Sequence, residues 1–167
     1  DAYRAEMGRD VSGPVRTIER WRGTPAPGDP GFITNATFAD DRRPLDAGEV
    51  NTGIARLERH HRRFRDVIGG VPVSDEIGII IHHLATAEQW YLGNIDLVPD
   101  GKRPNGPLER FAWIRAFTLR VLPTLADRDI LADCGGEGWT PRKVIRRTIW
   151  HERDHTRQIA TILAASA

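Results

Sequence analysis

The sequence predicts an all-α protein, a four-helix bundle preceded by an N-terminal extension. From about residue 47 onward, apolar residues recur at steps of three and four, which is the spacing of one face of an α-helix. Segments rich in Gly and Pro divide this part of the chain into four stretches of helix length. Each stretch carries an apolar sector too wide to leave in water, so packing the four together is the simplest way to bury them.

Residues 1–46 give mixed signals, and we expect them to form an N-terminal extension that is partly helical or irregular. Four apolar residues at helical spacing favour one short helix, with Ser12 as its N-cap: Val11, Val15, Ile18 and Trp21. The prolines and glycines between residues 25 and 31 forbid its continuation. The predicted domain organisation is therefore 1–46 for the extension and 47–167 for the bundle.

The first two bundle helices are predicted from one apolar stripe each. The first stripe consists of Val50, Ile54, Leu57, His61, Phe64 and Ile68. Gly69-Gly70 is expected to end this helix. The second stripe consists of Ile77, Ile81, Leu84, Tyr91 and Ile95. Ser74 is expected to cap the second helix, which ends before Pro99.

The third and fourth helices follow the same logic. The third runs from about Leu108 to Val121, and Pro123 is expected to bend or end it. Thr140 is a good N-cap for the fourth helix, with Pro141 as its first residue. The segments around residues 99–107 and 127–139 are long enough to cross an end of the bundle, so a simple up-down-up-down order is not assured.

The charge balance excludes several classes of partner. The chain has 24 Lys and Arg against 23 Asp and Glu, so no strong field favours nucleic acid or an anionic membrane, and no motif that reads nucleic acid is present. No apolar run reaches the length of a membrane span. The single cysteine, Cys134, cannot form an internal disulfide. The charge balance names no partner; we expect a cytoplasmic protein and leave open whether it forms a homodimer.

Six histidines carry the chemical signal, in three groups: His60 with His61, His82 with His83, and His151 with His155. His151 and His155 are four residues apart, so they share one face of the fourth helix and can chelate an ion. The apolar residues of that helix bracket both, so both are predicted to point into the bundle.

A helical projection separates the two histidines of the second helix. It places His83 beside Trp90 in the apolar arc and His82 among polar residues, so His83 is predicted to point inward and His82 outward. His61 lies on the stripe of the first helix and is interpreted as a core residue or a neighbour of the ligands. His60 lies among arginines.

A divalent metal ion is the hypothesis that accounts for three converging imidazoles. A lone inward histidine is more often a hydrogen-bonded core residue. Three of them would leave several ring nitrogens without partners in the core, whereas one ion binds all three. Three neutral imidazoles suit zinc, nickel and iron alike.

The segment from His151 to His155 also matches HExxH, the helical motif of zinc proteases with Glu152 as the base. Those enzymes need a further ligand downstream. Residues 156–167 contain no His, Asp, Glu, Gly or Cys, so a protease of this type is disfavoured.

Two segments resemble the DinB/YfiT-like metalloenzyme family. Residues 81–91 are similar to the HL-x-x-x-E-x-W/Y segment of that family's second helix. Residues 139–141, followed by His151, His155 and Gln158-Ile159, are similar to its last helix. The resemblance covers about Ala47 to Ala165. It implies a four-helix bundle in which His83, His151 and His155 bind one divalent ion.

The activities implied by the resemblance centre on small thiols. Relatives include mycothiol-dependent maleylpyruvate isomerase, bacillithiol transferases and the histidine-binding module of ergothioneine-forming sulfoxide synthases. A transferase or isomerase of a low-molecular-weight thiol is therefore expected, and metal-assisted hydrolysis is also chemically reasonable. Glu152 and Glu88 are the candidate general bases, with an inter-helix salt bridge as the alternative for each. The other classes are a metal- or small-molecule-binding bundle without turnover, and a metal-free interaction module.

Overall fold

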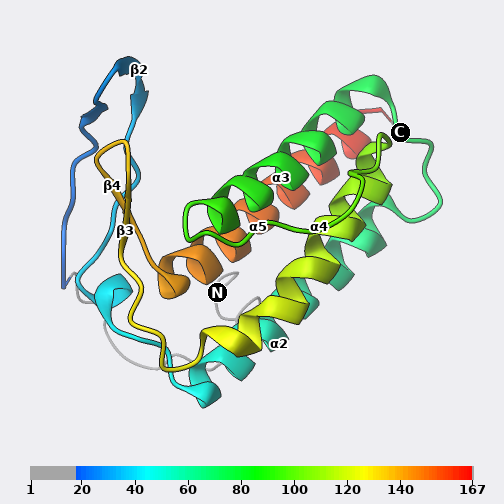
Figure 1. The fold of residues 1–167 in the computed structure, drawn as a ribbon. Helices are drawn as coiled ribbons and strands as arrows, with labels where there is room; N and C mark the ends of the chain where they lie inside the picture. The colour runs from blue at the N-terminus through cyan, green and yellow to red at the C-terminus, as the bar shows by residue number, and fades with distance from the viewer. Residues whose placement is uncertain (1–17, 167) are drawn as a thin grey trace.

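The computed structural model describes residues 18–166, and this part of the chain is predominantly helical (Figure 1). Its four α-helices are α2 (Ala47–Ile68), α3 (Asp75–Gly93), α4 (Pro107–Val121) and α5 (Pro141–Ala165). The predicted all-α fold class is thereby confirmed. The short helix expected around Val11 lies mostly outside the described residues, and its last two positions, Ile18 and Trp21, belong to no helix.

Three of these four helices, α2, α3 and α5, begin where a side chain accepts a hydrogen bond from a backbone N–H group of the first turn. At α2, Asp46 and Glu49 form a reciprocal capping box, with 2.7 Å from the Glu49 N–H to the Asp46 carboxylate. Ser74 caps α3, as predicted. Thr140 accepts a hydrogen bond of 3.1 Å from the backbone of Lys143 and caps α5, whose first residue is Pro141.

The order of the helices is not up-down-up-down. α3 packs against both α4 and α5, and α2 packs against α5. Residues 94–106 run back along the bundle, so α3 and α4 point the same way (Figure 1). α4 ends at Val121 and continues as a short 3-10 helix, η2 (Leu122–Leu125), which contains Pro123.

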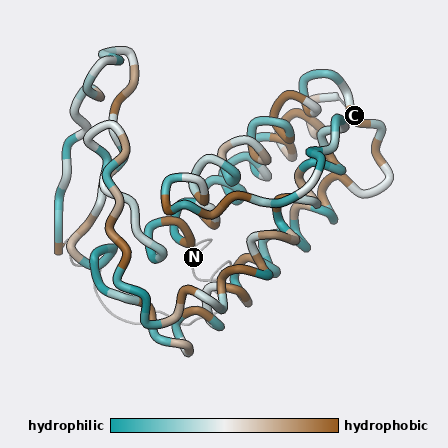
Figure 2. The backbone as a smooth tube through the Cα atoms, viewed as in Figure 1, coloured by the Kyte–Doolittle hydropathy of each residue, from teal (hydrophilic) through white to brown (hydrophobic). Residues whose placement is uncertain are grey.

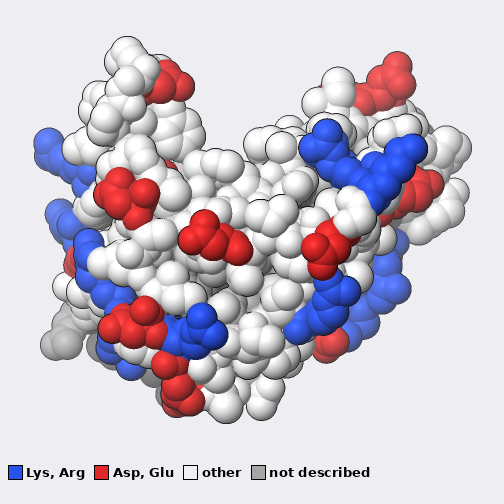
Figure 3. All heavy atoms as spheres, in the orientation of Figure 1, with Lys and Arg blue, Asp and Glu red and all other residues white. Residues whose placement is uncertain are grey.

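The core lies between the four helices, because each turns its apolar stripe toward the others. Figure 2 shows hydrophobic and hydrophilic stretches alternating along the helices. Seven aliphatic core residues have no exposed side-chain surface: Leu57, Ile81, Leu92, Ile114, Leu122, Val144 and Ile159. None of the helices formed by residues 18–166 is long and apolar enough to cross a membrane. Basic and acidic side chains are interspersed on the face drawn in Figure 3.

Two short hairpins lie outside the bundle. β1 (Pro25–Ala26) pairs with β2 (Asp29–Ile33), and β3 (Ala132–Cys134) pairs with β4 (Glu137–Trp139). The second hairpin lies within the segment of residues 127–139 that was expected to be a loop. Gly135 and Gly136 both have positive φ, 65° and 80°, which is the backbone of a tight two-residue hairpin turn.

The last part of the N-terminal extension is packed onto α5 and does not stand apart from the bundle. Lys143 is completely buried and donates hydrogen bonds to the Asn35 carbonyl and the Thr37 hydroxyl, at 3.1 and 2.9 Å. It also contacts the Glu137 carboxylate and the Gly138 carbonyl, at 2.9 and 2.8 Å. One ammonium group therefore joins the extension, the second hairpin and α5.

Candidate metal centre

Three histidines from two helices converge on one point. His83 comes from α3, and His151 and His155 come from α5. The Nε2 atom of His151 lies 3.1 Å from Nε2 of His83 and 3.1 Å from Nε2 of His155. One nitrogen of each ring lies within 4.8 Å of the other two. The structure thus brings together all three predicted metal ligands.

The helix packing explains this convergence. α3 lies against α5, and one helical turn separates His151 from His155, so the two stand one above the other beside His83. The three ring centroids are 4.5 to 5.1 Å apart, with interplanar angles of 74° to 85°. The rings therefore meet through their edges, where the nitrogen atoms lie.

Burial and neighbouring positive charges favour the neutral form of two of these imidazoles, His83 and His151. Burial, reinforced by the neighbouring His155, His83 and Arg147, lowers the pKa of His151 from 6.5 to about 3. Burial and His155 also lower the pKa of His83. A neutral imidazole has a lone pair on one ring nitrogen and can serve as a metal ligand.

The donor set fits a divalent ion. Hydrogen bonds alone cannot satisfy the cluster well, because Nε2 of His151 carries either one hydrogen or one lone pair and faces two other nitrogens. Imidazole nitrogens that bind zinc at about 2.0 to 2.1 Å stand roughly 2.9 to 3.4 Å apart in octahedral or tetrahedral geometry. The two contacts of 3.1 Å fall within that range.

The cluster lies at the surface of the bundle. His151 is buried and His155 half-buried, but His83 is exposed, so the prediction that His83 points inward is wrong. The core-facing side of α3 is formed by residues such as Leu84 and Leu92, and His83 stands at the edge of that face next to α5. The candidate centre is consequently open to solvent on the α3 side.

The other three histidines stand apart from the cluster. His82 is exposed, as predicted, and its Nε2 lies 3.1 Å from the Arg110 guanidinium. His61 is half-buried, and its Nδ1 lies 2.9 Å from a Glu152 carboxylate oxygen. His60, which was placed among the arginines, is buried, because it lies one turn from both Leu57 and Phe64 on the core face of α2.

Glu88 and Glu152 belong to a buried ion-pair network centred on Arg115 of α4. The three residues are each no more than 2% exposed. Arg115 donates to both oxygens of Glu88 at 3.0 and 2.8 Å, and to one oxygen of Glu152 at 2.9 Å. Thr118 donates to Glu88 as well, and His61 occupies the other oxygen of Glu152. All four carboxylate oxygens are therefore engaged away from the three Nε2 atoms.

This network agrees with the salt-bridge alternative for both glutamates, and their catalytic role stays a prediction. Burial alone would raise the pKa of Glu152, but the charge of Arg115 and the hydrogen bond from His61 bring it below its ordinary value. Sequence reasoning missed Arg115. The available signal was its position among Phe111, Ile114 and Thr118 on the core face of α4.

Cys134 has no part in the cluster. It is half-buried on β3, and its Sγ lies 3.8 Å from the Asn94 carbonyl. Burial, helped by nearby acidic groups such as Asp133, raises the pKa of its thiol. A raised pKa disfavours the nucleophilic thiolate.

A comparison with known proteins found no matching family model, no matching curated protein and no matching solved structure. The fold and the site define the chain as a helical protein with a candidate three-histidine metal centre.

Proposed function

We propose that this chain is a divalent-metal protein of DinB-like type in which His83, His151 and His155 hold one ion. The observation that carries the proposal is the pair of Nε2 contacts, both of 3.1 Å, that meet at His151. The order of the ligands along the chain supports it, because the resemblance implies one histidine from the second bundle helix and two from the last.

We further propose that the protein is an enzyme, a transferase or isomerase that uses a low-molecular-weight thiol. An ion held by three imidazoles keeps free coordination positions, where it acts as a Lewis acid or lowers the pKa of bound water or thiol. The exposure of His83 leaves an approach to that position from solvent. The network around Arg115 joins α3, α4 and α5 and holds the histidine-bearing helices in register.

One observation favours a second candidate, a metal- or small-molecule-binding bundle without turnover. Both glutamates proposed as bases have their oxygens committed to Arg115, His61 and Thr118. A general base must reach the proton that it removes. If turnover is found, the Glu152→Gln variant tests the role of this glutamate: retained metal with lower turnover assigns Glu152 to the chemistry, whereas unchanged turnover excludes it as the base.

Metal analysis of protein purified without a histidine tag tests the first proposal. We expect about one equivalent of zinc, nickel or iron, with anomalous scattering from a crystal placing it at the three Nε2 atoms. Protein that stays metal-free after incubation with each ion contradicts the proposal and leaves the histidines structural. Turnover of bacillithiol, mycothiol or glutathione with an electrophile then supports the enzyme, and its absence with all three supports the binding protein.

A further inference from the structure

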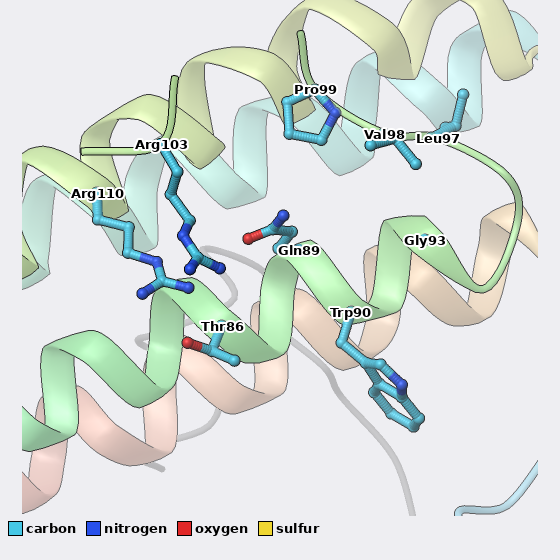
Figure 4. Close-up of a pocket in the computed structure, with 9 residues that line it drawn as sticks. All are labelled: Thr86, Gln89, Trp90, Gly93, Leu97, Val98, Pro99, Arg103 and Arg110. Carbon is cyan, nitrogen blue, oxygen red and sulfur yellow. The ribbon is translucent and has the colours of Figure 1, made fainter. Parts of the chain in front are cut away.

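A pocket lies on the side of α3 that faces α4 and the segment joining the two helices. It has a volume of about 300 Å³, within the lower range of small-molecule sites. Gln89 and Trp90 of α3, Arg103 of the connecting segment and Arg110 of α4 contribute to its walls. Figure 4 shows both guanidinium groups and the Gln89 amide directed toward the same space.

The two arginines have no acidic partner in the part of the chain that the structure describes. Arg110 is 94% buried, since only 6% of it is exposed, and its Nε has no hydrogen-bond partner there. Its Nη1 lies 3.1 Å from Nε2 of His82. Burial, together with the positive charge of Arg103, lowers the pKa of Arg110. Two like charges therefore share a partly desolvated pocket.

This arrangement is unfavourable without a counter-ion. A buried guanidinium ordinarily has a carboxylate beside it, as Arg115 has in the neighbouring network. The planar fork of a guanidinium matches two oxygens of a carboxylate or phosphate, and the unbonded Nε–H of Arg110 is one such donor. The Gln89 amide is a further donor at the same place.

Most of the remaining lining is apolar. Leu97, Val98 and Pro99 form one wall, and the Trp90 ring, 42% exposed, contributes another surface. An inorganic ion would need only the polar end of such a pocket. A small molecule with an anionic group and an apolar body fits both ends.

We propose that this pocket binds an oxyanion, the carboxylate or phosphate group of a small molecule, through Arg103 and Arg110. The site does not require a metal, because none of the three clustered histidines lines it. It therefore stands whether or not the metal proposal holds.

Titration of the full chain with inorganic phosphate, and separately with acetate, tests this site. In nitrogen-15 NMR spectra we expect the Trp90 indole and Gln89 amide signals to shift, and sodium chloride at equal ionic strength to leave them in place. The anion that binds more tightly identifies the ligand as a phosphate or a carboxylate. If neither anion moves these signals, the proposal is wrong.

Arginine variants with a matched control give the second arm. Arg103→Gln and Arg110→Gln should each weaken anion binding about tenfold or more, the scale of one charge-assisted hydrogen bond. Lys102→Gln removes an exposed positive charge next to the pocket and should change the affinity by less than about threefold. Arg103 is exposed, so its variant should fold even if Arg110→Gln does not. Equal affinities in all three variants contradict the assignment.

Variants of one site, measured for the ligand of the other, distinguish the anion pocket from the metal centre. His151→Ala should keep phosphate binding in the pocket, and Arg103→Gln should keep the metal content. The proposal is wrong if His151→Ala is the only variant that loses phosphate binding and if phosphate shifts the NMR signals of the clustered histidines. The anion would then bind at the metal centre.

Discussion

The Nε2 atom of His151 lies 3.1 Å from Nε2 of His83, although 68 positions separate the two residues in the chain. The contact joins α5 to α3, two helices that are adjacent in space but not consecutive in sequence. The position of the candidate centre is therefore set by how the bundle is ordered.

Replacing any one of the three clustered histidines with alanine should remove the metal. Each supplies one nitrogen to a set that lies within 4.8 Å, so two ligands remain after each change. Elemental analysis after dialysis measures the loss, and His82→Ala is the matched control because His82 is next to His83 but outside the cluster. If the His82→Ala and His83→Ala variants have the same metal content, whether both keep the metal or both lose it, the cluster is not the site.

Arg115→Met should destabilise the protein by about 3 to 5 kcal/mol, because it leaves the buried carboxylates of Glu88 and Glu152 without their counter-charge. Urea unfolding followed by circular dichroism gives the free energy of unfolding. Arg120→Met makes the same change at an exposed position of α4 and should cost far less. Similar losses in the two variants would mean that the network contributes little.

The metal-free protein should lose stability as the pH falls from about 6.5 toward 3. The pKa of His151 is about 3 in the folded protein against an ordinary 6.5, so below 6.5 the unfolded chain binds a proton that the folded chain refuses. This one group contributes a slope of at most about 1.4 kcal/mol per pH unit. Urea unfolding in the presence of a chelator should show wild type losing more stability than His151→Gln over this range. If the stabilities of wild type and His151→Gln fall in parallel as the pH decreases, the pKa of His151 is not lowered in the folded protein.

Lys143→Met should loosen the packing of residues 34–38 of the N-terminal extension on α5. The change removes the donor shared by Asn35, Thr37 and Gly138 and leaves the buried Glu137 carboxylate without its counter-charge, which should cost about 2 kcal/mol or more. Hydrogen exchange should become faster in the second hairpin and in residues 34–38, but not in α3. Lys102→Met, at an exposed lysine, should leave the exchange unchanged. Uniform acceleration across the bundle would instead indicate a global effect.

Features set by local chemistry were predictable from the sequence. Ser74 and Thr140 cap their helices through their own next turn, so the starts of α3 and α5 needed no knowledge of the packing. The spacing of His151 and His155 is local in the same way. The second hairpin could also have been predicted, because a Gly-Gly pair such as Gly135-Gly136 between two segments of strand length is a recognised turn signal.

Features set by the order of the helices were not predictable in this way. A projection of one helix shows which residues share a side, but the exposure of His83 depends on where α5 lies along the edge of α3. Arg115 was missed because an arginine in a single helix favours solvent, and its two partners come from α3 and α5. The burial of His60 likewise depends on how much of the surface of α2 is covered by the rest of the bundle.

The return path of residues 94–106 bears on how the protein folds as it is made. Because α3 and α4 point the same way, they cannot form a simple helical hairpin, and the packing of α2 on α5 must wait for the last helix to be synthesised. Contacts between such distant segments require the closure of long loops, which slows folding. His83 is consequently translated well before the two histidines that join it, and the complete ligand set exists only after α5 has docked.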